Sequence, residues 1–331
     1  MQTLMEKPHI QIANMSRWYV VSRALHSVAR LGIANFMSHE PLAVEEIARA
    51  SGTQPLLLER LLDFLCAYQI FRKNNQGYAL TELSQVLRDD DEHSMRDVLS
   101  MVDDSWWQAF SDMETSIQQG TPAFELQHGT DFFAFLGENP QKQQNFDRGM
   151  ARISTFDIQA IVNAYDFSSL NTLVDMGGGR GGLAQAISQK YPKLHTTVFD
   201  SQAVISQLRP EEYNENVSLQ AGNFFAQIPN ADAYFFKGVL HDFNDETMFK
   251  IVQNCAQQMP RTSRLLIAEQ VLPEDDAPHP NKTMDVVMMV LLGGRQRSLS
   301  GWQQAVAQAG FVLKNTYPTA SLFTLMEFIL P

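Results

Sequence analysis

The stretch LVDMGGGRGG at residues 173–182 decides the fold, because it joins a strand pattern to a helix pattern through a glycine-rich turn. Glycine has no β-carbon, so such a turn can adopt positive φ angles and bring its backbone close to a ligand. The helix that follows points its free N–H groups at the same ligand. The segment therefore predicts a cofactor-binding turn at the edge of an α/β sheet.

The residues around this turn alternate between short β-rich runs and helical runs. Strands are expected at 172–176, 196–200, 217–220, 233–237 and 264–269, and helices from near Gly182, Gln202, Asp245 and Ser300. Such alternation predicts a mostly parallel sheet covered by helices on both faces. The chain ends in two strand patterns, 311–317 and 323–330, whose short connection permits only antiparallel pairing. We therefore expect one reversed terminal strand, unlike an ordinary dinucleotide-binding sheet.

The first hundred residues have a different pattern. Residues 10–36 have the apolar spacing of one amphipathic helix, and a second helix ends near Gly52. A third helix is expected from Pro55 to Tyr68, followed by short strands at 70–72 and 78–80 around the turn NNQG. Helix, turn, helix and hairpin in this order predict a winged-helix domain.

Composition argues against DNA binding by this domain. The chain carries a net charge of -12 and has a sequence pI near 5.1, so its surface repels nucleic acid and anionic membranes. The third helix, LLLERLLDFLC, lacks the cationic and amide side chains that meet phosphates and base edges. We expect the domain to pack against the other domain or a second subunit, with no nucleic-acid or membrane partner.

The two cysteines, Cys66 and Cys255, lie far apart in apolar helical patterns, which is typical of buried thiols rather than a disulfide. Residues 1–10 form no signal segment, and no apolar stretch has the length of a spanning helix. We therefore expect a cytoplasmic protein. Residues 101–165 are helical and rich in aromatic side chains, most of which we assign to the core and a few to a substrate pocket.

The glycine turn alone does not identify its cofactor, because Gly177, Gly179 and Gly182 also match the dinucleotide fingerprint. Asp175, at the end of the strand before the glycines, would repel a pyrophosphate but can accept a hydrogen bond from the ammonium of a methionine moiety. Asp200 ends the next strand, where a carboxylate binds the ribose hydroxyls of either cofactor. These features favour S-adenosylmethionine over NAD.

The segment FFKGVLHDF at residues 235–243 follows the fourth strand and places His241 just beyond the expected cofactor crevice. Imidazole accepts a proton near neutrality, and a hydroxyl oxygen is a far better nucleophile toward a sulfonium methyl as it loses its proton. Glu269, at the tip of the next strand, can hydrogen-bond the far ring nitrogen. The pattern predicts His241 as a general base, although spacing alone also fits a structural histidine.

Taken together, these segments resemble the caffeate-type and hydroxyindole-type family of small-molecule O-methyltransferases, in its bacterial natural-product form. The matching motifs cover nearly the whole chain: the winged-helix front end, FDRGMARIS (146–154), LVDMGGGRGG, VFD, GNFF (222–225), FFKGVLHDF, LLIAEQVLP, MDVVMMVLLGGRQRS (284–298) and AGF (309–311).

The resemblance implies an α/β fold: a Rossmann-like seven-stranded methyltransferase sheet with a reversed last strand, preceded by an α-helical winged-helix dimerisation domain. It implies a dimerisation domain at 1–100, a helical, substrate-lining linker at 101–165 and an S-adenosylmethionine-binding domain at 166–331. Members of the family are usually homodimers through the N-terminal domain.

The resemblance also implies roles for individual residues. The cofactor S-adenosylmethionine would be held by Ser154, Asp175, Gly177, Gly179, Asp200, Asn223, Phe224 and Lys237, with Asn223 and Phe224 beside the adenine. The catalytic group would be His241 with Glu269 and Asp242, and no metal is expected. The small hydroxylated substrate would meet Met150, Trp106, Met288 and Gln296.

Two positions depart from the family pattern. Asn223 stands where an aspartate is usual, and its amide can still accept a hydrogen bond from the adenine amino group. Gln296 replaces the second acid that flanks the catalytic histidine, so we expect His241 to be a poorer base or to rely on Glu269. Gln296 also leaves open a relative that binds S-adenosylmethionine but catalyses decarboxylation, hydroxylation or a pericyclic rearrangement.

Overall fold

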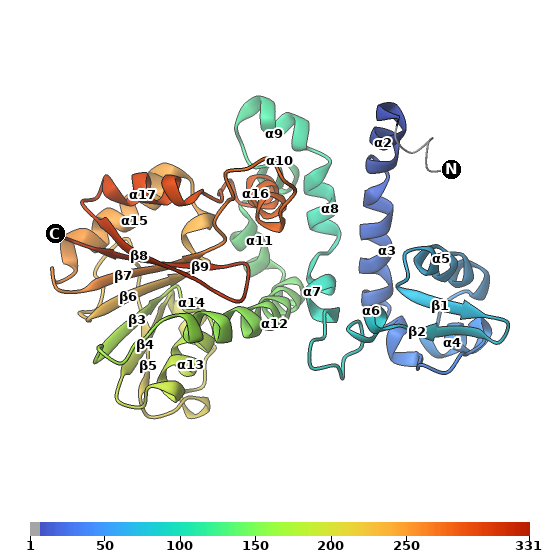
Figure 1. Cartoon of the computed structure of the whole chain (residues 1–331), viewed down its shortest axis with the longest axis horizontal. Helices are drawn as coiled ribbons and strands as arrows, with labels where there is room; N and C mark the ends of the chain where they lie inside the picture. Colours follow the sequence, from blue (N-terminus) through green and yellow to red (C-terminus); the bar gives the residue numbers. More distant parts are fainter. Residues whose placement is uncertain (1–6) are drawn as a thin grey trace. The chain divides into compact units, whose positions relative to one another are not determined.

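The computed structural model describes residues 7–331 and divides the chain into two compact units (Figure 1). The first unit contains the chain up to Asp103 together with Asn139–Arg152, and the second contains Asp104–Glu138 and Ile153–Pro331. The long helix α12 (Pro140–Ala164) contributes to both units. Within the part of the chain that the structure describes, no helix is both long and apolar enough to cross a lipid bilayer.

The first unit contains the predicted winged helix. Its elements are α2 (Pro8–Met15), α3 (Trp18–Arg30), η1 (Ile33–Phe36), α4 (Val44–Ser51), α5 (Pro55–Ala67), β1 (Phe71–Asn74), β2 (Gly77–Leu80), α6 (Glu82–Gln85) and α7 (Arg96–Met101). Strands β1 and β2 pair antiparallel. Buried residues from α3, α4, α5 and the hairpin form one core, which includes Val28, Ile47, Leu62 and Phe71. This apolar core holds the helices against the hairpin.

The single amphipathic helix predicted over residues 10–36 is wrong, because the structure breaks it twice. At the first break, the Ser16 hydroxyl donates to the carbonyl of Ala13 at 2.9 Å, a local bond that competes with continued helix. At the second, Gly32 has φ +64°, a left-handed conformation that ends the helix before η1. Apolar spacing continued across both positions and concealed the breaks.

The second unit is built on a seven-stranded sheet of order β5-β4-β3-β6-β7-β9-β8. The strands are β3 (Thr172–Met176), β4 (His195–Asp200), β5 (Val217–Ala221), β6 (Ala233–Lys237), β7 (Arg264–Glu269), β8 (Val312–Pro318) and β9 (Thr324–Ile329). The first five pair in parallel, whereas β9 pairs antiparallel with both β7 and β8. The predicted fold class, with its reversed last strand, is confirmed.

Helices cover both faces of this sheet, as predicted (Figure 1). One face packs on α15 (Asp245–Gln258) and α17 (Leu299–Ala307), and the other on α13 (Gly182–Lys190) and the second half of α12. Phe235 and Phe236 are neighbours in β6 and are both fully buried, in opposite cores. Burial on both faces explains why the central strands read as continuous apolar runs.

The second unit also contains α8 (Asp104–Phe110), α9 (Met113–Gln119), α10 (Ala123–His128), α11 (Phe132–Glu138), α14 (Gln202–Ile205) and α16 (Pro280–Leu291), of which α14 contacts β4 and β5. Helix α16, which packs against α8 and α10, was not predicted as a helix, because its run of apolar residues has no clear polar face. Both cysteines are free, as expected, but only Cys255 is buried, whereas Cys66 is half-buried.

Candidate functional site

The glycine-rich turn between β3 and α13 leaves its main chain accessible to a ligand. Gly177, at φ +72°, donates its N–H to the carbonyl of Phe199 at 2.8 Å, which fixes the turn to β4. Gly179 has φ +55°, and a β-carbon built there would meet nothing within 4 Å. The backbone at Gly179 is therefore bare on the side where a ligand can approach closely.

Asp200, at the end of β4, is locked against this turn. Its Oδ2 accepts from the N–H of Gly179 at 2.9 Å, and its Oδ1 accepts from the N–H of Ser201 at 2.6 Å. Each carboxylate oxygen has a second lone pair, and the residue is half-buried. Asp200 is thus oriented in advance and can still accept hydrogen bonds from vicinal hydroxyls.

Asp175, the last but one residue of β3, is a buried carboxyl with unused hydrogen-bonding capacity. The residue is 2 % exposed, and its Oδ2 has no hydrogen-bond partner among residues 7–331. Burial raises the pKa of Asp175 to about 7, although nearby Lys237 opposes the shift. A buried acceptor without a donor is costly, so this site fits a ligand that brings a cationic donor, such as an ammonium group.

Lys237, at the end of β6, links this carboxyl to α12. Its Nζ donates to Oγ of Ser154 at 3.3 Å and lies 5.1 Å from the centre of the Phe323 ring. Burial lowers the pKa of Lys237, and the charges of Asp157 and Asp175 oppose that shift. Asp157 was not among the predicted site residues, although it lies three residues after Ser154, on the same face of α12.

Asn223 and Phe224 lie just after β5. The Asn223 side-chain oxygen accepts from the N–H of Phe225 at 2.9 Å, which orients the amide, and its second lone pair and the amide N–H groups can still bind a ligand. Phe224 packs edge-on against Phe236 and Phe243, with ring centres 6.2 and 6.0 Å away. An aromatic wall next to an amide donor suits a flat heterocycle.

His241 lies in the short helix η3 (Leu240–Asp242), which follows β6, and faces two carboxylates. Its Nδ1 is 2.5 Å from Oε2 of Glu269, and its Nε2 is 3.3 Å from Oδ1 of Asp242. Burial disfavours the imidazolium, but the two carboxylates outweigh it and raise the pKa of His241 to about 10. The imidazole is therefore a strongly basic group.

Glu269, the last residue of β7, is fully buried, and both of its carboxylate oxygens have hydrogen-bond partners. Its Oε1 accepts from the backbone N–H groups of Val239, Leu240 and His241 at 3.2, 3.0 and 3.3 Å. The same side chain thus fixes the backbone of η3 and the orientation of the imidazole. A carboxylate behind a histidine is the usual arrangement for holding an imidazole in one tautomer.

Gln296 lies in the loop after α16, which packs on the histidine segment. The Arg295 N–H donates to the carbonyl of His241 at 2.9 Å, and the Gln296 N–H donates to Asp285, a residue that the sequence analysis did not single out, at 2.7 Å. The Gln296 side chain is completely buried, yet neither amide atom has a partner within the described chain. A buried amide in this state can still bind one acceptor and one donor.

The other predicted substrate residues lie on separate helices. Trp106 in α8 packs edge-on against Phe132, with ring centres 5.6 Å apart, and Met288 is buried in α16. Helices α8 and α16 pack against each other in the second unit. Met150 belongs to the part of α12 in the first unit and is 39 % exposed. The substrate role of all three stays a prediction.

The chain matches two family models. Residues 110–312 match an O-methyltransferase domain, and residues 13–90 match an O-methyltransferase dimerisation domain. Among curated relatives, phenazine O-methyltransferase PhzM of Lysobacter antibioticus is 32% identical over 322 residues, which cover 96% of this chain and 94% of the relative. The mitomycin biosynthesis 6-O-methyltransferase of Streptomyces lavendulae is 29% identical over 305 residues. The match covers 90% of this chain and 87% of that enzyme.

The fold is also similar to solved structures. An O-methyltransferase (NcsB1) from neocarzinostatin biosynthesis, crystallised with S-adenosylmethionine and 2-hydroxy-5-methyl naphthoic acid, superposes with a TM-score of 0.82 at 30% identity. The match covers 94% of this chain and 96% of that one.

Proposed function

The chain belongs to the S-adenosylmethionine-dependent O-methyltransferases of natural-product type, and on that premise we propose that it methylates a hydroxyl of a small aromatic or polyketide-like molecule with His241 as the general base. The observation that carries this proposal is the contact of Nδ1 of His241 with the buried carboxylate of Glu269 at 2.5 Å. This contact fixes Nδ1, so the nitrogen left for the substrate proton is Nε2, which faces Asp242 in the free protein.

S-adenosylmethionine is the cofactor, and it supplies an electrophilic methyl group on a sulfonium. We propose that Asp175, with its unpartnered Oδ2, accepts from the ammonium of the cofactor, and that Asp200 accepts from the ribose hydroxyls. In this proposal the main chain at Gly177 and Gly179 lies close to the cofactor, because neither residue has a β-carbon. Lys237 and Ser154 lie beside the methionine part of the cofactor. Asn223 and Phe224 would bind the adenine.

The proton of the substrate hydroxyl would pass to Nε2 of His241. In the free protein Asp242 lies 3.3 Å from this nitrogen, so a substrate hydroxyl has to compete with that carboxylate for it. The pKa of His241, raised to about 10, is close to the ordinary value of a phenol, about 10. Proton transfer between two groups of matched pKa is nearly balanced, and the Glu269 carboxylate then stabilises the imidazolium.

The substrate side of the proposal rests on Gln296, Met288 and Trp106, which all belong to the second unit. Thioether and indole side chains bind flat apolar rings, and the unsatisfied amide of Gln296 offers one donor and one acceptor to a polar substituent. The similar enzyme crystallised with a hydroxylated naphthoic acid supports a substrate of this chemical class.

We also propose that the protein is a homodimer through its first unit. The match to a dimerisation domain supports this, and so do large apolar side chains of α2 and α3 that are exposed in the single chain. Ile12 is 66%, Trp18 60% and Tyr19 64% exposed. Such a concentration of exposed apolar area is typical of an interface. Light scattering after gel filtration should give twice the mass of 37.4 kDa, and a monomer at micromolar concentration would contradict this proposal.

His241→Ala tests the catalytic proposal. Formation of S-adenosylhomocysteine should be measured with a panel of simple phenols, hydroxynaphthoic acids among them. The variant should lose about 10²–10⁴-fold in turnover, while its affinity for S-adenosylhomocysteine in calorimetry stays within about twofold, because His241 acts on the substrate proton. Wild-type turnover in the variant would overturn the role of His241. A wild-type protein that binds the cofactor product but methylates no member of the panel would favour the non-methylating alternative.

A further inference from the structure

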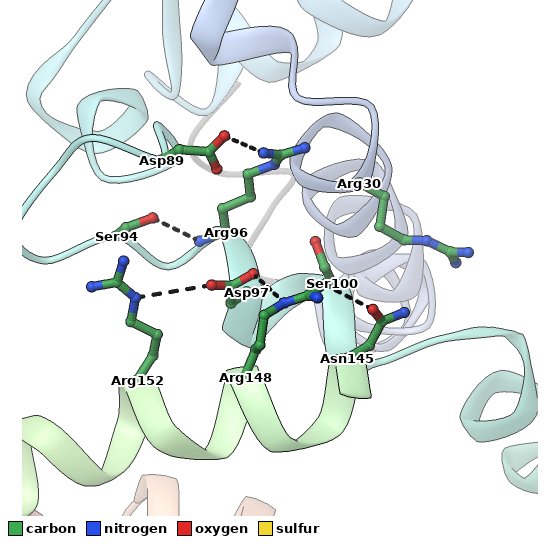
Figure 2. Close-up of a pocket in the computed structure, with 9 residues that line it drawn as sticks. All are labelled: Arg30, Asp89, Ser94, Arg96, Asp97, Ser100, Asn145, Arg148 and Arg152. Carbon is green, nitrogen blue, oxygen red and sulfur yellow. Dashed lines mark hydrogen bonds and ion pairs between the residues drawn. The ribbon is translucent and has the colours of Figure 1, made fainter. Parts of the chain in front are cut away.

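The first unit contains a polar cavity of about 480 Å³ that has no part in the proposed reaction (Figure 2). Four arginines line it, Arg30, Arg96, Arg148 and Arg152, with only two aspartates, Asp89 and Asp97. The cavity is therefore electropositive in a chain whose net charge is -12.

The two aspartates do not neutralise these arginines. Asp89 is bound to Arg96, which also donates to the carbonyl of Ala29 at 3.0 Å. Asp97 is shared, because its two oxygens lie 3.4 Å from Arg148 and 3.9 Å from Arg152. One carboxylate thus faces two guanidinium groups. Arg148 also donates to the side-chain oxygen of Asn145 at 2.8 Å, and the two arginine side chains are 47% and 42% exposed, so their remaining donors can reach a ligand from solvent.

Arg30 adds a further positive charge from α3. Its guanidinium has no hydrogen bond or ion pair to any residue in the described range of 7–331. Arg148 and Arg152 lie one turn apart on the same face of α12, as Figure 2 shows. Like charges at this spacing repel each other, and the single carboxylate of Asp97 offsets only part of that repulsion, so a bound anion would relieve the rest.

The donors come from three separate elements around one cavity: Arg30 from α3, Arg96 from α7, and Arg148 and Arg152 from α12. The hydroxyl of Ser100 and the amide of Asn145 line the same space and add neutral polar groups. Guanidinium groups bind phosphate and carboxylate oxygens through paired hydrogen bonds, and donors from several directions suit a small anion with several oxygens.

We propose that this cavity binds a small, doubly negative oxyanion, either a phosphate group or a dicarboxylate. The excess of two positive charges matches two negative charges, and the volume admits a molecule larger than a single ion. The anion would bind among the guanidinium groups that line the cavity and so hold α7 to α12 within the first unit, with Arg30 adding to the positive charge around it. Bound anion should therefore stabilise this unit against unfolding.

The test is the thermal stability of the full-length protein at about pH 8, where phosphate is mostly doubly charged. Sodium phosphate and sodium malonate should be titrated against sodium chloride and sodium acetate at equal ionic strength. At ten times its Kd, a bound anion should raise Tm by about 3 °C, and chloride and acetate should not. A rise with phosphate alone identifies a phosphate site, and a rise with malonate alone a dicarboxylate site.

Arg30→Gln and Arg148→Gln should each weaken the response to the anion at least fivefold in midpoint concentration. Arg209→Gln is the matched control, because Arg209 is 74% exposed and outside the cavity, and this variant should respond like the wild type. Arg30 makes no described contact, so its replacement leaves the fold intact. No rise in Tm for the wild type, or equal responses of all three variants, would overturn the proposal. A loss of dimer mass in the cavity variants without any anion effect would also overturn it, in favour of a contact between subunits.

Discussion

One carboxylate, that of Glu269, holds both the ring and the backbone of His241: its Oε2 lies 2.5 Å from Nδ1, and its Oε1 accepts from the His241 N–H at 3.3 Å. The glutamate ends β7 and the histidine follows β6, and these strands are parallel neighbours. The position of the imidazole is thus fixed by sheet register rather than by a loop. Any change at Glu269 should alter both the basicity and the placement of His241.

The first prediction concerns the pH dependence of turnover. Because the pKa of His241 is raised above 6.5, the free base is scarce at neutral pH, and kcat/KM should rise with pH through and beyond neutrality. Glu269→Gln removes a negative charge beside the ring, so the rise should move to lower pH and the plateau should fall about 10²-fold. Steady-state profiles from about pH 6 to pH 10 measure both effects.

Glu246→Gln is the control for this experiment, because Glu246 has a side chain 79% exposed on α15 and lies apart from the histidine. Its profile should superimpose on that of the wild type. If Glu269→Gln lowers turnover but leaves the position of the rise unchanged, Glu269 only supports the backbone of η3 and does not tune the imidazole.

The second prediction concerns Asp175 and cofactor affinity. The carboxyl has a pKa of about 7, and only its charged form attracts an ammonium group. Affinity for S-adenosylhomocysteine should therefore increase as pH rises from about 6 to 8. Asp175→Asn should flatten that dependence and weaken binding at pH 8 by about 10- to 100-fold, the usual range for a lost charged hydrogen bond. Calorimetry across this range is the measurement, with the exposed Asp276→Asn as control.

The sequence was sufficient to predict the residues that end strands. In a parallel sheet the carboxyl ends of neighbouring strands meet at one edge, so Asp175, Asp200, Lys237 and Glu269 were expected near one another. The structure places Lys237 against Ser154 and Glu269 against His241. The position of a residue along its strand, together with the order of the strands, is therefore enough to predict which side chains lie at the same edge of the sheet.

Features that depend on tertiary packing could not be predicted in the same way. The insertion of β9 between β7 and β8 follows from pairing across the whole sheet, whereas the sequence indicated only that β8 and β9 are antiparallel. The interaction of Asp157 with Lys237 was recognised only in the structure, because a single acidic residue in an amphipathic helix normally faces solvent. Trp106, Met288 and Met150 lie on helices, so their positions could not be inferred from the end of a strand. Large apolar residues also occur in any core, so the sequence could not distinguish pocket residues from core residues.

The third prediction concerns Gly222, the residue directly after β5. A β-carbon at this position would lie 2.1 Å from the ring of Phe199, a side chain that is 1% exposed. Gly222→Ala should therefore lower the free energy of unfolding by about 1–3 kcal/mol, the usual cost of overpacking. Gly137→Ala is the matched control, because a β-carbon there meets nothing within 4 Å and alanine favours the helix α11. Urea denaturation of both variants decides the matter, and equal stabilities would show that Phe199 adjusts freely.

The last prediction separates two roles of Gln296. Gln296→Met keeps the volume and removes a buried amide that has no described partner, so stability should increase by about 1 kcal/mol. If the amide binds a polar substituent of the substrate, as proposed, KM for a hydroxynaphthoic acid should rise about tenfold in the same variant. Gln296→Glu, in contrast, adds a carboxylate near the histidine segment, which should raise the pKa of His241 further and move the pH profile upward.

The two variants should change the stability in opposite directions. Gln296→Met should stabilise the protein because it removes a buried polar group, and Gln296→Glu should destabilise it because it buries a charge. Thermal denaturation and substrate titration of the same preparations therefore test both effects together. An unchanged KM in Gln296→Met, combined with the expected gain in stability, would show that the amide does not contact the substrate. A pH profile unaffected by Gln296→Glu would place the side chain too far from the imidazole to influence proton transfer, and would leave Glu269 and Asp242 as the carboxylates that set its basicity.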